Sequence, residues 1–165
     1  MNDDGANARA RLSELVAKFS TAMLVTRTAE GQLRARPLSF AGEHDGLLCF
    51  STSAESPKVT ELSDDPRVAI TMQDQSRYVS ISGLAELSDD PALIEQLWRE
   101  PWRVWFPEGK SDPKLRILRV KPVLAEYWDQ TGVRGIKYLI EMVKAYATGT
   151  TPPSGTSSDD VKVPL

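Results

Sequence analysis

The chain has very little of what metal centres, disulfides and nucleophilic active sites are built from. Its 165 residues include one cysteine and one histidine. One cysteine cannot form an internal disulfide, and the two residues together provide no zinc-type ligand set. His44 falls in an expected turn and Cys49 alternates within an expected strand, which favours a surface histidine and a buried thiol over catalytic roles. We therefore expect no catalytic side chain and no metal site.

Long apolar runs and surplus positive charge are also missing. No stretch approaches the roughly 18 apolar residues that span a bilayer, and residues 1–5 are polar and acidic, without the apolar core of a signal peptide. The net charge of −3 at pH 7 disfavours nucleic-acid binding, although small barrels can bind single strands through basic and aromatic faces. We expect a cytoplasmic protein that binds neither membranes nor nucleic acid.

What the sequence does contain is a series of short strand patterns joined by turns. Apolar alternation and buried apolar segments predict strands at 22–26, 33–40, 47–51, 67–73, 78–87, 115–120 and 123–128. Asp45-Gly46 favours a tight turn with positive φ, Gly83 is expected to mark a bulge, and Lys121-Pro122 separates the last two strands. Antiparallel strands with short turns favour a small barrel, because closure leaves no exposed edges.

Helical patterns flank these strands. Apolar spacing predicts helices at 6–19, 91–98 and 135–146, and a short helix begins at Ser56-Pro57. From Gly149 onwards the chain is rich in proline, serine, threonine and glycine. We therefore expect one folded domain over residues 1–147 and a disordered polar tail over residues 148–165.

The segment Leu33–Leu62 is the centre of the functional interpretation. A serine N-cap followed by proline marks a helix start whose free N–H groups favour an anion. Lys58 comes next, and Arg34 and Arg36 lie on the first strand of the preceding hairpin. If the hairpin folds back, these cations and the helix start could converge on one phosphate. Two alternatives stay open: Lys58 could be a solvated surface lysine, and Arg36 could pair with an acid such as Glu61.

Several short motifs follow one another between about residues 8 and 147. They are Arg36-Pro-Leu38, Phe50-Ser-Thr52, Ser56-Pro-Lys58, Tyr78-Val-Ser-Ile-Ser-Gly83, Trp105-Phe-Pro-Glu-Gly109, Asp112-Pro113 and Glu126-Tyr-Trp128. Each motif alone is weak, but their order resembles the general stress protein branch of the pyridoxamine 5'-phosphate oxidase-related family. The resemblance implies a mainly β (α+β) fold, a split β-barrel of about six antiparallel strands with flanking helices. It also implies a homodimer with FMN at the subunit interface.

The resemblance implies a role for each matched segment. The first motif lies beside the flavin ring and ribityl chain, the second is the neighbouring strand end, and the third holds the phosphate. The last supplies an aromatic side chain, usually across the dimer interface. The implied cofactor-binding residues are Arg36, Pro37, Leu38, Phe50, Ser51, Thr52, Ser56, Lys58 and Trp128.

The chain departs from the true oxidase in one segment. The stretch that reads pyridoxal phosphate is absent, and Gly132-Val-Arg-Gly135 stands in its region. Oxidation of pyridoxamine phosphate is therefore not expected. The chain also lacks a Walker loop, a Rossmann fingerprint and a nucleophile elbow, so a bound cofactor would have to supply any chemistry.

Two functions remain open. The first is an FMN-dependent oxidoreductase that uses a reduced nicotinamide and a small-molecule acceptor, and the alternative is a non-catalytic FMN store or stress sensor. Related split barrels also take deazaflavin or haem, which leaves the cofactor itself open. The aromatic residues Trp98, Trp102, Trp105 and Phe106 are expected to pack within the protomer or at the dimer interface. A position for Trp105 over the flavin is the alternative.

Overall fold

The computed structural model describes residues 3–129 and 161–164. Its elements in chain order are α1 (Asp3–Val16), β1 (Thr21–Arg27), β2 (Leu33–His44), β3 (Leu47–Ser53), α2 (Pro57–Asp64), β4 (Arg67–Gln73), β5 (Arg77–Ser88), α3 (Pro91–Leu97), the 3-10 turns η1 (Glu100–Val104) and η2 (Gly109–Ser111), β6 (Leu115–Asp129) and β7 (Val161–Pro164). Among these described elements, no helix combines the length and apolar character that a membrane crossing requires.

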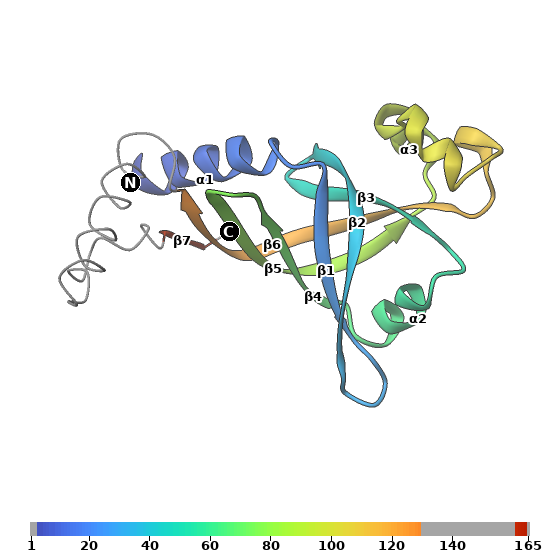
Figure 1. Ribbon diagram of the computed structural model, residues 1–165, viewed down its shortest axis with the longest axis horizontal. Helices are drawn as coiled ribbons and strands as arrows, with labels where there is room; N and C mark the ends of the chain where they lie inside the picture. Colours follow the sequence, from blue (N-terminus) through green and yellow to red (C-terminus); the bar gives the residue numbers. More distant parts are fainter. Residues whose placement is uncertain (1–2, 130–160, 165) are drawn as a thin grey trace.

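Six antiparallel strands form a closed barrel, which confirms the predicted fold class. The strand order is β3-β2-β1-β4-β5-β6, and β6 closes the circuit by pairing with β3. β7 pairs with the second half of β6, outside this circuit. α1 and α2 lie at opposite ends of the barrel, and α3 lies to one side (Figure 1). Closure pairs the backbone N–H and C=O groups that an open sheet would leave at its edges.

Strand β6 is continuous, whereas the sequence predicts two strands. Its 15 residues run through Lys121 and Pro122 without a break. Its pairing with β5 shifts between Ser82 and Gly83, where Val123 is the extra residue. The bulge predicted at Gly83 is thus confirmed, and it explains the continuity, because a bulge accommodates a proline within a strand. A Cβ on Gly83 would lie 2.6 Å from the carbonyl oxygen of Lys121, so only glycine allows this approach.

The ends of the chain differ in part from the prediction. α1 ends at Val16 rather than at residue 19. In the segment predicted to be disordered, the four residues Val161–Pro164 form β7 and pair with Leu124–Tyr127 of β6. Disorder is wrong for these four residues, because composition does not reveal the backbone partners that β6 offers. The helix predicted at 135–146 and the rest of the tail lie outside the described residues.

Two apolar clusters hold the barrel and its helical cover together. The first fills the barrel interior with residues that alternate along the strands, among them Leu24, Phe50 and Ile81. The second lies outside the barrel, where α3 and η1 pack against β3 and the first half of β6. Trp102 and Phe106 are its buried aromatic members. Within the described residues, the cover formed by α3 and η1 lies on one side of the barrel.

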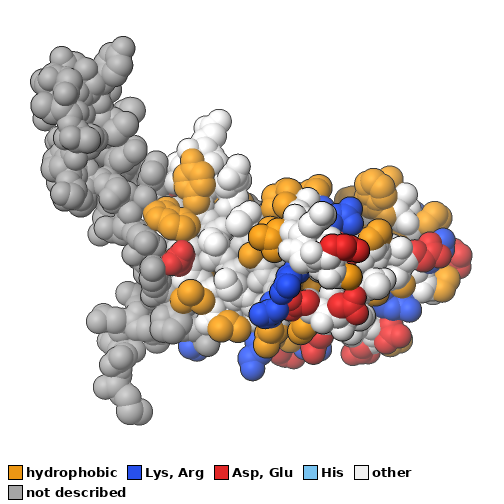
Figure 2. Space-filling view, turned by 90° about the horizontal axis from the view of Figure 1, so that it is seen from below, with side chains coloured by type: hydrophobic (Ala, Val, Ile, Leu, Met, Phe, Trp, Pro, Cys, Tyr) orange, Lys and Arg blue, Asp and Glu red, His pale blue; other side chains and the backbone are white. Residues whose placement is uncertain are grey.

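The opposite side of the barrel carries apolar side chains that no described element covers. Because side chains alternate along a strand, the neighbours of the core residues on β1, β5 and β6 point outward. We call the exposed apolar residues on this side the outer apolar face: Met23, Leu33, Tyr78, Leu84, Val123 and Leu124. Leu33, Leu84 and Val123 line one shallow depression of this face. Hydrophobic side chains surface in several groups in the space-filling view (Figure 2).

Candidate functional site

The β2–β3 hairpin leads into α2, and the predicted phosphate-binding residues lie at this junction. Ser56 is the N-cap of α2, and Pro57 is its first residue. The Ser56 hydroxyl makes no capping hydrogen bond; it accepts one of 2.6 Å from Lys58 Nζ instead. Lys58 Nζ also donates to Thr52 Oγ1 at 3.0 Å, which ties the helix to the end of β3. The start of the helix thus places a lysine side chain against the barrel.

Lys58 is a buried cation. The residue is 8 % exposed, so it is not the solvated surface lysine that the sequence left open. Both of its hydroxyl partners are neutral and leave its charge uncompensated. Burial lowers the pKa of Lys58 below its ordinary value, the nearby charge of Arg36 lowers it further, and Glu61 opposes the shift. A buried ammonium in this state favours an anionic ligand.

Glu61 of α2 pairs with both arginines of β2. Arg36 Nη2 donates to its carboxylate at 2.8 Å, and Arg34 Nη1 donates at 3.1 Å. The Thr26 hydroxyl donates at 2.5 Å from the neighbouring strand β1. Burial raises the pKa of Glu61, but the hydrogen bonds from Thr26 and Arg36 and the charges of both arginines hold it below its ordinary value. The alternative in which Arg36 pairs with Glu61 is therefore confirmed for one guanidinium nitrogen.

The other terminal nitrogen of Arg36 has a different environment. Arg36 Nη1 is buried and has no hydrogen-bond partner within the described part of the chain. A buried N–H without a partner is costly, so Arg36 Nη1 is a candidate donor for an added acceptor, although Arg36 itself does not line the cavity described below. Arg36 contacts Glu61, which lies one helical turn after Lys58 on α2, so the two cations meet the same helix. This donor set fits the dianionic phosphate of a mononucleotide.

A cavity of about 480 Å³ opens beside the junction. Residues of β1, β2, β3, α2 and the segment after η1 form its walls. Five of the implied cofactor-binding residues line it: Pro37, Leu38, Ser51, Thr52 and Lys58. Its volume lies within the range of small-molecule sites, roughly 300–1,000 Å³. The cavity therefore brings most of the implied residues onto one surface.

The other implied residues lie beyond the cavity wall. Arg36 contacts Glu61, and Ser56 contacts Lys58, so both flank the lining residues. The Phe50 side chain is buried in the barrel interior, so a ligand in the cavity can meet its backbone but not its ring.

Trp128 lies far from the cavity along β6. The first residue of β6, Leu115, pairs with the cavity residue Ser53, whereas Trp128 pairs with Tyr78 near the other end of the strand. Thirteen residues of strand separate Leu115 from Trp128, and Trp128 does not line the cavity of its own protomer. Because its neighbour Tyr127 is buried in the core, the alternation places Trp128 on the side of the outer apolar face. The expected contact between Trp128 and the flavin thus stays a prediction, in which a second subunit supplies the side chain.

Three cavity residues were not assigned from the sequence: Thr21, Ser39 and Ser53. Two more, Trp105 and Phe106, were expected in packing or at the dimer interface, with a position over the flavin as the alternative for Trp105. The aromatic cluster is confirmed as packing for Trp102, whose ring meets that of Trp98 edge-on at 5.8 Å, and for Phe106. Trp105 is 78 % exposed in the single chain, so its expected place at a dimer interface, or over the flavin, stays a prediction. The sequence held one signal for the three unassigned residues: Ser39 follows Leu38 in the strand, so alternation predicts that its side chain points outward.

The remaining reactive side chains lie elsewhere. Cys49 is buried, and burial raises the pKa of its thiol to about 11, which disfavours a nucleophilic role. His44 Nε2 lies 3.1 Å from Gln96 Oε1, and its ring is also close to Asp45 in the β2–β3 turn. Neither residue lines the cavity. Among the described residues, no three histidine, cysteine or acidic side chains gather as a metal site.

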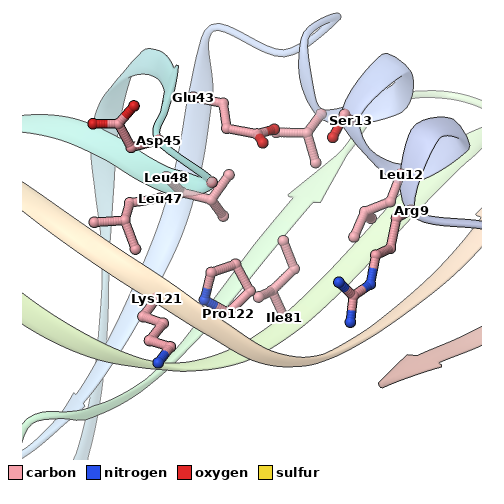
Figure 3. Close-up of a pocket in the computed structure, with 12 residues that line it drawn as sticks. Arg9, Leu12, Ser13, Glu43, Asp45, Leu47, Leu48, Ile81, Lys121 and Pro122 are labelled. Atoms are coloured by element: carbon pink, nitrogen blue, oxygen red, sulfur yellow. The ribbon is translucent and has the colours of Figure 1, made fainter. Parts of the chain in front are cut away.

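A second cavity of about 330 Å³ lies beneath α1, at the end of the barrel away from α2 (Figure 3). Leu12, Leu48 and Ile81 provide apolar walls, whereas Arg9 and Glu43 bring charges of both signs to the same cavity. It contains none of the implied cofactor-binding residues. Its mixed charge gives it no preference for an anion, so we place the candidate site at the cavity beside Lys58.

The family of the chain follows from a comparison of its sequence. The family model described as pyridoxamine 5'-phosphate oxidase like matches residues 7–153. The chain belongs to the pyridoxamine 5'-phosphate oxidase-like family. The resemblance drawn from the ordered motifs is thus confirmed for this family. Comparison with curated proteins gives no match.

Several solved structures share this fold, and their names assign them to general stress proteins. A Jannaschia sp. CCS1 protein assigned to general stress protein 26 is 23 % identical, with a TM-score of 0.74, covering 97 % of this chain and 99 % of its own. General stress protein 26 from Bacillus anthracis is 21 % identical, with a TM-score of 0.63, covering 71 % and 93 %. The general stress FMN/FAD binding protein from Xanthomonas citri is 26 % identical, with a TM-score of 0.66, covering 77 % and 92 %.

Proposed function

We propose that this pyridoxamine 5'-phosphate oxidase-like protein binds FMN in the cavity beside Lys58 and acts as a flavin-dependent oxidoreductase. The observation that carries the proposal is a buried lysine held by neutral hydroxyls, together with an Arg36 N–H that has no partner among the residues that the structure describes. The Xanthomonas citri relative, named for FMN/FAD binding, supports the flavin as the ligand.

The residues of the chain have distinct roles in this proposal. Lys58 and Arg36 hold the phosphate, and the hydroxyls of Ser51 and Thr52 offer hydrogen bonds beside it. Pro37 and Leu38 supply an apolar wall for the ring system. Bound FMN would supply the two-electron redox chemistry between a reduced nicotinamide and a small acceptor. The chain itself would anchor the flavin and limit the access of water.

Uptake of the cofactor is the first test. The purified protein is expected to take up FMN, turn yellow and release free FMN on heating, and riboflavin should bind more weakly because it lacks the phosphate. Deazaflavin and haem are titrated in parallel. A protein that stays colourless and fails to take up FMN at micromolar concentration would remove the proposal, and preferential uptake of haem or deazaflavin would change the cofactor.

We further propose that the protein is a homodimer, with the outer apolar face as its interface. Exposed contiguous apolar surface is typical of an interaction site. Met23 of this face pairs with the cavity residue Pro37, so the face borders the cavity. Trp128 projects from the same side of the barrel. A two-fold contact through this face could therefore place Trp128 of one protomer at the cavity of its partner.

The oligomeric state tests this second proposal. Light scattering at micromolar concentration is expected to give a dimer for the parent and a monomer for Leu84→Glu, which puts a charge into the outer apolar face. Val104→Glu is the matched control, because Val104 is exposed on η1, on the helical side of the barrel. A monomeric parent, or a dimer that tolerates the glutamate at residue 84, would contradict the interface.

A non-catalytic FMN store or sensor is the second candidate function. The observation that favours it is the composition of the cavity: among its described lining residues, Lys58 is the one titratable side chain, so none of them offers a group for proton transfer near pH 7. Anaerobic addition of NADH or NADPH to the FMN-loaded protein separates the two functions. Bleaching of the flavin absorbance supports the oxidoreductase, and no bleaching with either nucleotide supports storage or sensing.

A further inference from the structure

Trp105 presents an indole to solvent at the wall of the cavity. The residue is 78 % exposed, and it lines the same cavity as Lys58. Large aromatic side chains usually bury most of their surface, because they carry the greatest apolar area of any side chain. The neighbouring Val104 is equally exposed at 78 % but does not line the cavity. The exposure of Trp105 is therefore tied to the cavity in a way that the exposure of Val104 is not.

The backbone on both sides of Trp105 is fixed. The carbonyl oxygen of Trp102 accepts hydrogen bonds from the N–H groups of Trp105 at 2.9 Å and Phe106 at 3.0 Å. Trp102 and Phe106 are both buried in the cluster outside the barrel. The two anchors hold the short helical turn in place, so the indole is presented at the cavity by a rigid support. A site supported in this way loses little entropy when a ligand covers it.

We infer that Trp105 is a specificity-determining residue, a stacking surface for the planar ring of a heteroaromatic mononucleotide whose phosphate Lys58 holds. This inference rests on the proposed function. Lys58 recognises a phosphate of any kind, but an indole adds affinity only for a ligand that also carries a flat aromatic system. The cavity thus selects aromatic phosphates over sugar phosphates. Trp105 acts on the ring, and Lys58 acts on the phosphate.

The two roles give different patterns of ligand affinity. Trp105→Ala is expected to weaken FMN and riboflavin alike, on the order of 10- to 100-fold, because both carry the ring. Trp105→Phe should restore most of this affinity, since it keeps an aromatic face. Lys58→Met should weaken FMN and leave riboflavin unchanged. Val104→Ala serves as the control for the exposed turn and should bind both flavins as the parent does.

Affinities are measured by titration of flavin fluorescence, with quenching of protein fluorescence as a second readout. Flavin binding is expected to quench tryptophan emission more in the parent than in Trp105→Phe, because stacked rings exchange energy at contact distance. Circular dichroism checks that each variant keeps the fold. The exposed position of Trp105 makes unfolding of its variants unexpected.

The outcomes separate the inference from the proposed function. A parent that binds neither flavin refutes the proposed function and, with it, the inference. A parent that binds both, together with Trp105→Ala that also binds both equally well, refutes the inference alone. Loss of FMN without loss of riboflavin in Trp105→Ala would also refute it, because the residue would then act on the phosphate. An equal loss in Val104→Ala would assign the effect to the turn or to a subunit contact.

Discussion

Replacement of Lys58 by methionine should separate flavin affinity from fold stability. Methionine keeps an unbranched apolar stem in the buried site and removes the ammonium group. A hydrogen bond to a charged group is worth about 1.5–3 kcal/mol, so the affinity for FMN should fall roughly ten- to a hundredfold. Riboflavin has no phosphate, so its affinity should not change. Lys58→Ala should weaken FMN by a similar factor.

The stability of the flavin-free protein should respond differently. Replacement of Lys58 removes its hydrogen bonds to Thr52 and Ser56, which lowers the free energy of unfolding. The variant also removes a buried charge, and the lowered pKa of Lys58 shows that the fold disfavours the charged form. The two effects have opposite signs, so we expect the free energy of unfolding to change by less than about 1 kcal/mol.

The assay is isothermal titration calorimetry with FMN and riboflavin, paired with urea unfolding of the flavin-free protein. Lys114→Met is the matched control, because Lys114 is exposed and forms its ion pair with Glu55 at 2.9 Å, away from the cavity lining. If the parent binds FMN and Lys58→Met binds it with the same affinity, the phosphate assignment is wrong. A variant that unfolds would instead show that Lys58 is a structural residue.

Three further outcomes follow from the structure. The affinity for FMN should fall as pH rises through the lowered pKa of Lys58, at a lower pH than the ordinary value of 10.5 would give, as calorimetry across pH would show. Gly83→Ala should lower the free energy of unfolding by about 1–3 kcal/mol, because the new Cβ would lie 2.6 Å from Lys121 O, as urea unfolding would measure. Hydrogen bonds from Arg77 lower the pKa of Asp74 to about 2, so the stability that this carboxylate gives near neutral pH should be lost as pH falls through about 2. Urea unfolding of Asp74→Asn between pH 2 and pH 5 should show a weaker acid dependence than the parent.

Each of these outcomes has its own control. In the pH titration, riboflavin is the control for ionisation of the flavin ring. If its affinity falls in parallel with that of FMN, Lys58 is not the cause. Ser82→Ala, on the exposed neighbour of Gly83, should leave stability unchanged; equal costs at both positions would contradict the close approach. An unaltered acid dependence in Asp74→Asn would show that its ion pair with Arg77 does not survive in solution.

The barrel could be predicted because its signals are local. Alternation along β1, β4 and β5 follows directly from the period of a strand. The Asp45-Gly46 pair predicted positive φ, and the observed φ values are 52° and 74°. Pro122 misled the prediction, because a proline within a strand reads as a break unless the bulge opposite it is recognised. The bulge at Gly83 and the proline belong to different strands, so only their pairing connects them.

The candidate site was only partly predictable, for a related reason. The helix start at Ser56-Pro57 and the lysine after it lie together in the sequence, so they were found. One guanidinium nitrogen of Arg36 binds Glu61, and the other has no partner within the described ranges; this arrangement depends on packing between β2 and α2. Trp102 and Trp105 are three residues apart and chemically identical, yet one is buried and the other exposed. Composition cannot predict which of the two is buried, because burial depends on which side of the helical turn packs against the barrel.

The length of β6 has a consequence for the proposed dimer. One end of this strand pairs with Ser53 at the cavity of its own protomer, and the other end carries Trp128, which the proposed dimer would place at the partner's cavity. Each copy of β6 would then lie beside two flavin sites, because it pairs with the wall residue Ser53 at one and places Trp128 at the other. A change in oxidation state that shifts this strand at one site would therefore also act on the other site. Such a protein would release or reduce its flavins as a pair, and half-occupied dimers should be scarce in a titration.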